Sequence, residues 1–191
     1  MCGIVGFTGD MQAAPILLDG LSKLEYRGYD SAGIAVFDHG NIKVKKCKGR
    51  LANLVEKMDE EGKPQGHVGI GHTRWATHGE PSDINSHPHG NKRVTIVHNG
   101  IIENYKKLKD FLVGEGYSFA SETDTEVAAK LLDYYYDGDP MKTIAKVLSE
   151  IKGSYALGIM FRDFPDEIFA VRKDSPLIVG VGEHENFIAS D

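Results

Sequence analysis

The chain begins Met1-Cys2-Gly3-Ile4-Val5-Gly6-Phe7, an apolar stretch with a cysteine directly after the initiator methionine. If Met1 is removed, Cys2 carries both a thiol, with an ordinary pKa of about 8.5, and an α-amine, with a pKa of about 8. A nucleophile and a base then lie within one residue. The stretch is also typical of a buried β-strand that happens to begin with cysteine, because free cysteine often packs as a small apolar residue. The stretch alone leaves both interpretations open.

The chain has 191 residues, enough for one large domain that buries roughly 70% of its unfolded surface without a disulfide or metal. A formal net charge of -6 disfavours a nucleic-acid partner, since nucleic-acid binding needs a clustered basic surface. No secretory signal and no apolar stretch of about 20 residues is present, so we expect no membrane partner. The two cysteines, Cys2 and Cys47, indicate a reducing, cytoplasmic environment, and Cys47 is assigned no function.

The spacing of apolar residues predicts the helices and strands. Helices are expected over residues 11–24, 51–61, 105–112, 124–136 and 141–151. Strands are expected over the opening stretch and over residues 32–37, 42–47, 68–73, 94–99, 155–161, 168–172 and 177–181. The stretch Asp38-His39-Gly40-Asn41 predicts a hairpin turn, and Thr123 and Glu126 are spaced as a capping box.

The order of these elements indicates the fold class. Strands come in hairpin-like pairs at both ends of the chain, with helices grouped between them, which favours antiparallel sheets covered by helices, class α+β. The sequence has no repeat, low-complexity tract or linker, so residues 1–191 are interpreted as one domain. The last residues, Ile188-Ala189-Ser190-Asp191, end without a tail or cap, and we expect the chain to be a piece of a longer protein.

A polar segment of about twenty residues follows strand 68–73, and loops of that length in compact domains are usually functional or disordered. Arg74 offers a planar guanidinium suited to a carboxylate, and Thr77 and His78 add hydrogen-bonding groups. Trp75 can cover a small ligand. Each residue also has an ordinary interpretation, such as a surface ion pair for the arginine or core packing for the tryptophan.

Five histidines lie in or next to this segment: His72, His78, His87, His89 and His98. Their density makes a metal site an alternative. A rigid proline separates His87 from His89, however, and the sequence has neither a His-Glu-x-x-His helix nor a cysteine pair. We therefore expect no metal and interpret most of these histidines as hydrogen-bonding residues.

Two polar motifs allow both a chemical and a structural interpretation. Asn99 and Gly100 can donate two hydrogen bonds to one oxyanion, but Asn-Gly is also a common tight turn. Asp124 can bind an ammonium group, or it can simply stabilise the start of a helix. Arg27 and Asp30 can form an ion pair at a turn or a brace beside the N-terminus.

Five stretches, in this order, carry a resemblance to a known family: Met1-Cys2-Gly3-Ile4-Val5-Gly6, Glu25-Tyr26-Arg27-Gly28-Tyr29-Asp30-Ser31-Ala32-Gly33, the loop from Thr73 to Pro81, His98-Asn99-Gly100-Ile101-Ile102-Glu103-Asn104, and Ser121-Glu122-Thr123-Asp124-Thr125-Glu126. On these stretches the whole chain resembles the class II glutamine amidotransferases, most closely the members that transfer ammonia to fructose 6-phosphate. Amidophosphoribosyltransferases share the N-terminal cysteine but look different in the Arg-Gly-Tyr-Asp and Arg-Trp-Ala-Thr-His segments.

The resemblance implies the four-layer αββα fold of N-terminal nucleophile (Ntn) hydrolases, with two antiparallel sheets between helices. It implies that Cys2 attacks the side-chain amide of L-glutamine, with its own α-amine moving the proton. A glutamyl thioester and free ammonia result. Asn99 and Gly100 are implied to form the oxyanion hole.

Substrate binding is implied in the same way. Arg74, with Thr77 and His78 nearby, is expected to hold the α-carboxylate of glutamine. Asp124 is expected to pair with the α-ammonium group.

Supporting roles follow for three further residues. Trp75 lies in the loop that closes over glutamine and gates ammonia, and Arg27 and His87 shape the surroundings of the nucleophile. No cofactor is implied.

The family's C-terminal sugar-phosphate isomerase region, through which the full-length enzyme is expected to form a homodimer, has no counterpart in the chain. The chain alone is therefore expected to hydrolyse glutamine without making glucosamine 6-phosphate.

Three alternatives stay open. The first is a catalytically silent module that binds glutamine for regulation. The second is the glutaminase domain of another class II amidotransferase, such as an amidophosphoribosyltransferase. The third is a metal-binding structural domain.

Overall fold

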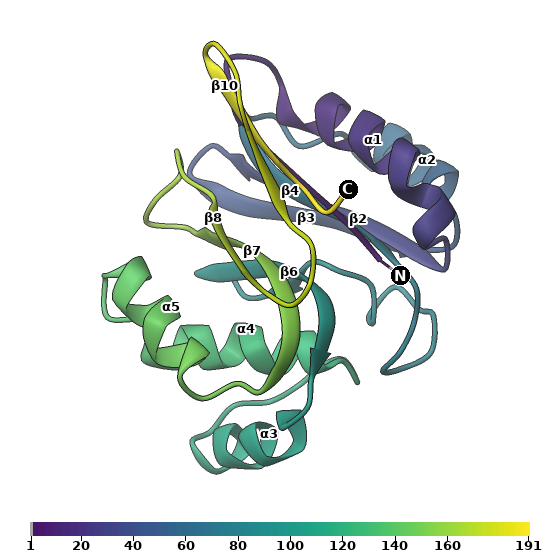
Figure 1. The fold of residues 1–191 in the computed structure, drawn as a ribbon. Coiled ribbons are helices and arrows are strands. Elements are labelled where there is room, and N and C mark those ends of the chain that lie inside the picture. The colour runs from purple at the N-terminus through teal and green to yellow at the C-terminus, as the bar shows by residue number, and fades with distance from the viewer. Residues whose placement is uncertain (1) are drawn as a thin grey trace.

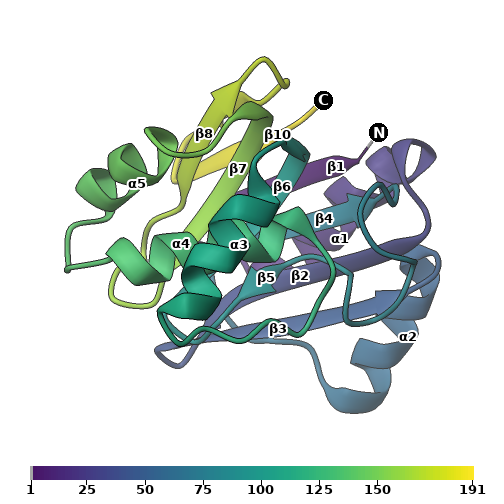
Figure 2. The ribbon, with the colours of Figure 1, turned by 90° about the horizontal axis from the view of Figure 1, so that it is seen from below.

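The structure, a computed structural model, describes residues 2–191 and consists of four layers (Figure 1). Two helices, α1 (Ala13–Leu24) and α2 (Leu51–Glu61), cover the outer face of a six-stranded sheet. A four-stranded sheet packs against the inner face of the first sheet. Its outer face is covered by three helices (Figure 2): α3 (Tyr105–Gly114), α4 (Asp124–Tyr135) and α5 (Pro140–Leu148). The predicted αββα arrangement of class α+β is therefore confirmed.

The named strands pair antiparallel throughout both sheets, as predicted. The first sheet has the order β3-β2-β4-β1-β10-β9, with β1 (Gly3–Gly9), β2 (Ser31–Asp38), β3 (Asn41–Lys48), β4 (Val68–Arg74), β9 (Ile178–Val181) and β10 (Glu185–Ala189). The second sheet has the order β5-β6-β7-β8, with β5 (His89–Gly90), β6 (Val94–Ile102), β7 (Gly153–Phe161) and β8 (Phe169–Lys173).

The opening strand β1 is buried on both faces because its side chains alternate between two cores. Val5 and Phe7 pack under the helices, whereas Ile4 lies between the two sheets. Each such buried side chain stabilises the folded state by about 1.5–3 kcal/mol. Strands β4 and β10 flank β1 on either side. The backbone next to Cys2 is therefore held firmly inside the first sheet.

The local signals for the β2–β3 hairpin turn and for the end of α2 are confirmed. The β2–β3 hairpin turns at His39 and Gly40, whose φ angles of 51° and 82° are the left-handed values that a two-residue hairpin turn of this kind requires. Helix α2 ends at Gly62, which has a φ of 98° and donates its backbone N–H to the Met58 carbonyl.

Strand β10 was not predicted. Its five residues contain two large apolar side chains, Phe187 and Ile188, which are adjacent and so show no alternation. The strand forms because β1 offers it a partner: Ser190 N donates to Ile4 O at 3.0 Å, and Ile4 N donates to Ser190 Oγ at 2.9 Å. The last described residues are thus tied to the first.

The predicted capping box at the start of α4 is only half formed. Thr123 Oγ1 accepts from Glu126 N at 3.2 Å, as expected. The Glu126 carboxylate, however, accepts from Ser121 N at 2.6 Å and from Ala120 N at 3.1 Å, while Thr123 N donates to Ser121 Oγ. The chain turns back before the helix, so the carboxylate meets these earlier N–H groups first.

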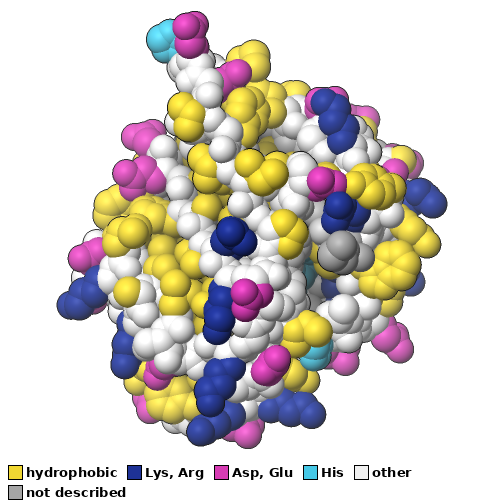
Figure 3. Space-filling model, viewed as in Figure 1, with side chains coloured by type: hydrophobic (Ala, Val, Ile, Leu, Met, Phe, Trp, Pro, Cys, Tyr) yellow, Lys and Arg dark blue, Asp and Glu magenta, His cyan; other side chains and the backbone are white. Residues whose placement is uncertain are grey.

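Acidic and basic side chains are interspersed on the face drawn in Figure 3, and hydrophobic side chains gather on its upper left part. The exposed apolar residues of the molecule include Ile178, Val179 and Val181 of the edge strand β9. Within residues 2–191, none of the helices is both long and apolar enough to cross a bilayer.

Candidate active site

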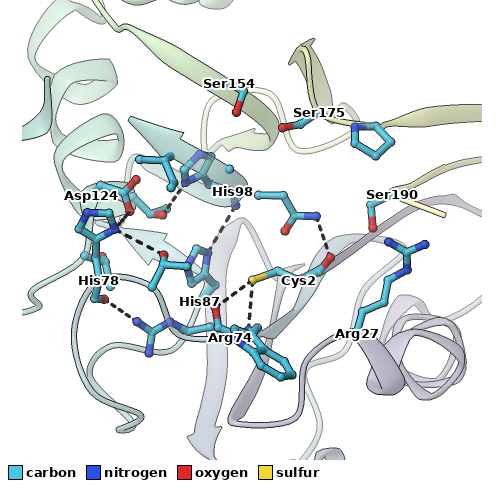
Figure 4. Close-up of a pocket in the computed structure, with 18 of the residues that line it drawn as sticks. Cys2, Arg27, Arg74, His78, His87, His98, Asp124, Ser154, Ser175 and Ser190 are labelled. Atoms are coloured by element: carbon cyan, nitrogen blue, oxygen red, sulfur yellow. Dashed lines mark hydrogen bonds and ion pairs between the residues drawn. The ribbon is translucent and has the colours of Figure 1, made fainter. Parts of the chain in front are cut away.

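A cavity of about 430 Å³ opens where β1 begins, β4 and β6 end and α4 begins (Figure 4). All ten residues that the sequence predicts for the site line this cavity: Cys2, Arg27, Arg74, Trp75, Thr77, His78, His87, Asn99, Gly100 and Asp124. They come from several elements that are far apart in the sequence. The fold therefore brings the predicted residues together, while their chemical roles stay predictions.

Cys2 is half-buried at the edge of the cavity, beside the residue that follows β4. Its Sγ accepts a hydrogen bond from Trp75 N at 3.1 Å, and Sγ also lies 3.5 Å from Trp75 O. Burial raises the pKa of the Cys2 thiol above its ordinary value. The thiol therefore needs a base in order to act as a nucleophile near neutral pH. The predicted release of an α-amine depends on Met1, which lies outside the described residues.

Asn99 is fixed next to Cys2 from two sides. Asn99 Nδ2 donates to Cys2 O at 3.1 Å, and Asn99 Oδ1 lies 3.0 Å from His72 Nε2. His72 Nε2 also lies 3.0 Å from His98 O. Both partners of this ring nitrogen are acceptors, so Nε2 carries the proton. Burial lowers the pKa of His72 to about 3, which keeps the ring neutral at pH 7.

Gly100 lies inside β6, which continues to Ile102, so the Asn-Gly pair is not a hairpin turn. Its φ of 112° is in the region that favours glycine. A Cβ atom at this position would lie 2.9 Å from Ser154 C and 3.0 Å from Tyr155 Cα of the neighbouring strand. The close approach of β6 and β7 beside the cavity therefore requires glycine here.

Arg74 is a buried cation in the cavity wall, and only 3% of its surface is exposed. Its Nη2 donates to His78 O at 2.5 Å and to Gly79 O at 3.0 Å. Its Nη1 donates to Glu80 O at 3.4 Å and lies 4.0 Å from Asp30 Oδ1. The guanidinium thus folds the loop back on itself and places a positive charge at the cavity wall.

Asp124 is the buried anion of the site and the first residue of α4. Its Oδ2 accepts from Ile102 N at 2.9 Å, and its Oδ1 lies 4.0 Å from His78 Nδ1. His78 Nδ1 is also 3.4 Å from Thr77 Oγ1. Arg74 and Asp124 therefore line one cavity with opposite charges, as recognition of an α-amino acid requires.

The three residues with predicted supporting roles lie around this centre. Trp75 is half exposed and packs edge-on against Tyr29, with ring centroids 5.8 Å apart. The buried His87 ring is stacked on His72 at 3.8 Å. Arg27 Nη2 pairs with Asp191 Oδ2 at 2.8 Å.

Of the two interpretations that the sequence left open for Arg27 and Asp30, the ion pair between them is wrong. Asp30 instead accepts a hydrogen bond from Ala76 N and faces Arg74. The physical reason is the fold, which places the last residue of the chain next to Arg27 and the start of the long loop next to Asp30.

Four of the five histidines that suggested a metal site, His72, His87, His89 and His98, are buried, whereas His78 is partly exposed. Burial lowers the pKa values of His87 and His89 well below their ordinary range, and that of His98 to a lesser degree. His98 Nδ1 lies 2.8 Å from Thr125 Oγ1. In the part of the chain that the structure describes, no three His, Cys, Asp or Glu side chains are arranged to hold a metal ion.

Sequence reasoning did not select every residue of the cavity wall. The others are His98, Ile101, Thr123, Thr125, Ser154, Asp174, Ser175, Pro176 and Ser190. Thr123 and Thr125 lie within a motif that the resemblance used, so their position was a usable signal. Ser154, Asp174 and Ser175 carry no local signal, because they reach the cavity only through the pairing of β7 with its neighbours.

Comparison with known proteins identifies relatives of the chain. A family described as "Glutamine amidotransferase domain" matches residues 72–191. Curated relatives from Clostridium tetani and Thermus thermophilus, both named glutamine--fructose-6-phosphate aminotransferase [isomerizing], are 61% and 52% identical over 193 residues. Each alignment covers 100% of the chain and 32% of the relative. The chain thus spans about a third of the length of these relatives.

Solved structures share the fold. The glutamine phosphoribosylpyrophosphate amidotransferase from B. subtilis superposes with a TM-score of 0.85 at 30% identity, covering 99% of the chain and 42% of that protein. A glutamine aminotransferase class-II domain protein from Silicibacter pomeroyi superposes with a TM-score of 0.68 at 14% identity, covering 98% and 88%.

Proposed function

The chain belongs to the family of glutamine amidotransferase domains and has the fold of the Ntn amidotransferases, and from this we propose that it hydrolyses L-glutamine to glutamate and ammonia. One observation carries the proposal. A single cavity brings together a cysteine thiol, two candidate oxyanion donors, a buried cation and a buried anion. These are the groups needed to bind an α-amino acid at one end and to cleave an amide at the other.

The reaction begins when Cys2 Sγ attacks the side-chain carbonyl carbon of glutamine. The resulting oxyanion accepts hydrogen bonds from Asn99 Nδ2 and Gly100 N. The α-amine of Cys2, freed by removal of Met1, takes the thiol proton and passes it to the leaving nitrogen. Ammonia departs and leaves a thioester. Water then attacks the thioester, which releases glutamate and restores the thiol.

The charged residues hold the other end of glutamine. Arg74, with Thr77 and His78, binds the α-carboxylate, and Asp124 binds the α-ammonium group. The buried position of both charges supports this assignment, because charges removed from water interact more strongly with a ligand of opposite sign. Trp75 covers the bound glutamine, and Arg27 and His87 support the walls around Cys2.

Residues 1–191 are proposed to form the glutaminase domain of a longer cytoplasmic enzyme. The names of the curated relatives and the third of their length that the chain spans support this proposal. In that enzyme, a C-terminal isomerase region accepts the ammonia and converts fructose 6-phosphate to glucosamine 6-phosphate, and the full-length chains form a homodimer. A full-length protein that releases ammonia but cannot aminate fructose 6-phosphate would contradict this assignment.

Two other functions would use the same fold or the same pocket. The glutaminase domain of an amidophosphoribosyltransferase shares the fold, but that solved relative is 30% identical, whereas the aminotransferase relative is 61% identical. A silent glutamine-binding module needs the same pocket and differs only in reactivity at Cys2.

The decisive experiment is the intact mass of the purified chain before and after incubation with an electrophilic glutamine analogue that alkylates amidotransferase cysteines. We expect a starting mass without Met1, followed by one adduct. The adduct should be absent from Cys2→Ala and present in Cys47→Ala, which removes the other, buried thiol. Retention of Met1, or a processed chain that stays unlabelled, would support the silent module instead.

A further inference from the structure

Lys46 on β3 lies outside the cavity but binds the backbone of residues 84–88, the segment that carries His87. Its Nζ donates to Ser86 O at 2.8 Å, to Pro88 O at 3.0 Å and to Ile84 O at 3.4 Å. An ammonium group has three donors, so all of them are directed at backbone carbonyls of residues 84–88. Surface lysines usually keep the ammonium group in water. The binding of the Lys46 ammonium to three backbone carbonyls is therefore a specific feature of this fold.

The hairpin beneath this segment is shaped to receive it. Gly33 of β2 is the register partner of Lys46. A Cβ atom at Gly33 would clash with the carbonyl group of His87 and would lie 2.7 Å from Lys46 Cβ. Residues 84–88 therefore pack directly on the β2–β3 hairpin. Gly33 lies against the His87 carbonyl group, and the Lys46 ammonium binds the carbonyl groups of the residues on either side of His87.

His87 connects this segment with the cavity. Its ring lies parallel to the ring of His72, with an angle of 10° and a centroid distance of 3.8 Å, and its Nδ1 accepts from His98 N at 3.4 Å. His72 Nε2 in turn lies 3.0 Å from Asn99 Oδ1. Moving residues 84–88 would remove the surface against which His72 is held, and His72 sets the orientation of Asn99.

We propose that Lys46 is a positioning residue, whose ammonium fixes residues 84–88 so that His87 and His72 hold Asn99 in its catalytic orientation. The proposal rests on the proposed role of Asn99 in glutamine hydrolysis. Lys46 itself is not among the residues that line the cavity.

The charge on Lys46 is present at neutral pH. Burial lowers the pKa of Lys46 to about 8, with Glu126 of α4, Asp83 of the loop and Lys57 of α2 as the neighbouring charges. At pH 7 the group is therefore still mostly an ammonium with three donors. A methionine at this position fills similar space but donates no hydrogen bond.

The test compares Lys46→Met with Lys45→Met. Lys45 is the preceding residue of β3, points to the other face of the strand and pairs with Glu61 at 2.8 Å. We expect Lys46→Met to lower kcat for glutamine hydrolysis roughly tenfold to a hundredfold, with KM changed less than about twofold. Lys45→Met should keep both parameters within about twofold of the wild type. Lys46→Gln, which retains two amide donors, should fall between Lys46→Met and the wild type.

A second readout does not depend on turnover. In NMR spectra, the ring resonances of His72 and His87 should shift in Lys46→Met and stay in place in Lys45→Met, because stacked rings report small displacements. A wild-type chain that releases no glutamate would contradict the proposed function, but the NMR comparison of the two variants would still be valid. Wild-type kcat in Lys46→Met together with unchanged histidine resonances would overturn the positioning role. If Lys46→Met does not fold, the same two measurements on Lys46→Gln decide.

Discussion

Asn99 is held by two partners, the Cys2 carbonyl on one side and His72 on the other. In the second contact His72 Nε2 is the donor, and burial keeps the His72 ring neutral by lowering its pKa. A chain of side chains thus determines where the amide nitrogen lies before any substrate enters. Such preorganised donors act in the transition state without having to reorient.

We predict that Asn99→Ala slows glutamine hydrolysis. Removing this proposed oxyanion donor should lower kcat for glutamine hydrolysis about 100- to 1,000-fold, which corresponds to about 2.7–4 kcal/mol of transition-state stabilisation. KM should change little, because the charged residues that are proposed to bind the other end of glutamine are untouched. Steady-state glutamate release measures both parameters. Asn53→Ala, on the exposed face of α2, is the matched control and should behave as the wild type. A kcat for Asn99→Ala close to that of the wild type would exclude the proposed role.

Helix α4 is the element on which the anionic end of the site depends. Asp124 is its first residue, and Thr123 is its N-cap, with a side chain that accepts from Glu126 N. Thr123 Oγ1 also lies 3.2 Å from His89 Nε2. Thr123 therefore connects the start of α4 with His89, which lies in β5 at the end of the long loop.

We therefore predict that Thr123→Ala lowers the free energy of unfolding by about 1 kcal/mol, the usual effect of losing an N-cap. KM for glutamine should rise as well, because the first turn that carries Asp124 loses its anchor. Thr123→Ser keeps the hydroxyl and should restore both values. Urea denaturation and steady-state kinetics on the two variants supply the comparison. Equal stability and KM in the alanine and serine variants would show that the cap plays no part.

Several histidines are buried near the junction of the two sheets and the long loop. Burial lowers the pKa of His72 to about 3, and those of His87, His89 and His98 shift in the same direction. In the unfolded chain these rings return to their ordinary pKa of about 6.5. Below that pH the unfolded state therefore binds more protons than the folded state.

For the whole molecule we predict acid sensitivity. The free energy of unfolding should fall as the pH drops from about 6.5 toward about 3, by up to about 1.4 kcal/mol per pH unit for each such histidine. Urea midpoints measured between about pH 7 and about pH 4 should show this slope. His89→Asn should reduce it. His184→Asn changes an exposed histidine at a φ of 59°, a conformation that asparagine tolerates, and should leave the slope unchanged. Stability that is independent of pH over this range would contradict the prediction.

Features that depend on a few neighbouring residues could be predicted from the sequence. Most helices and strands, the His39-Gly40 turn and the end of α2 at Gly62 follow from local periodicity and backbone preference, and the structure confirms them. The predicted site residues were selected through motifs whose order along the chain indicated the family, and the structure places them around one cavity.

Tertiary structure alone decided which distant residues become partners. It placed β10 beside β1, paired Arg27 with Asp191, directed the Glu126 carboxylate to Ser121 and set Lys46 under residues 84–88. It also showed that Asn99 and Gly100 lie inside a strand and not in a turn. These outcomes have no local signal, because a strand edge, a carboxylate or an ammonium group can satisfy its hydrogen bonds with many partners. The packing of the two sheets determines which partner is within reach.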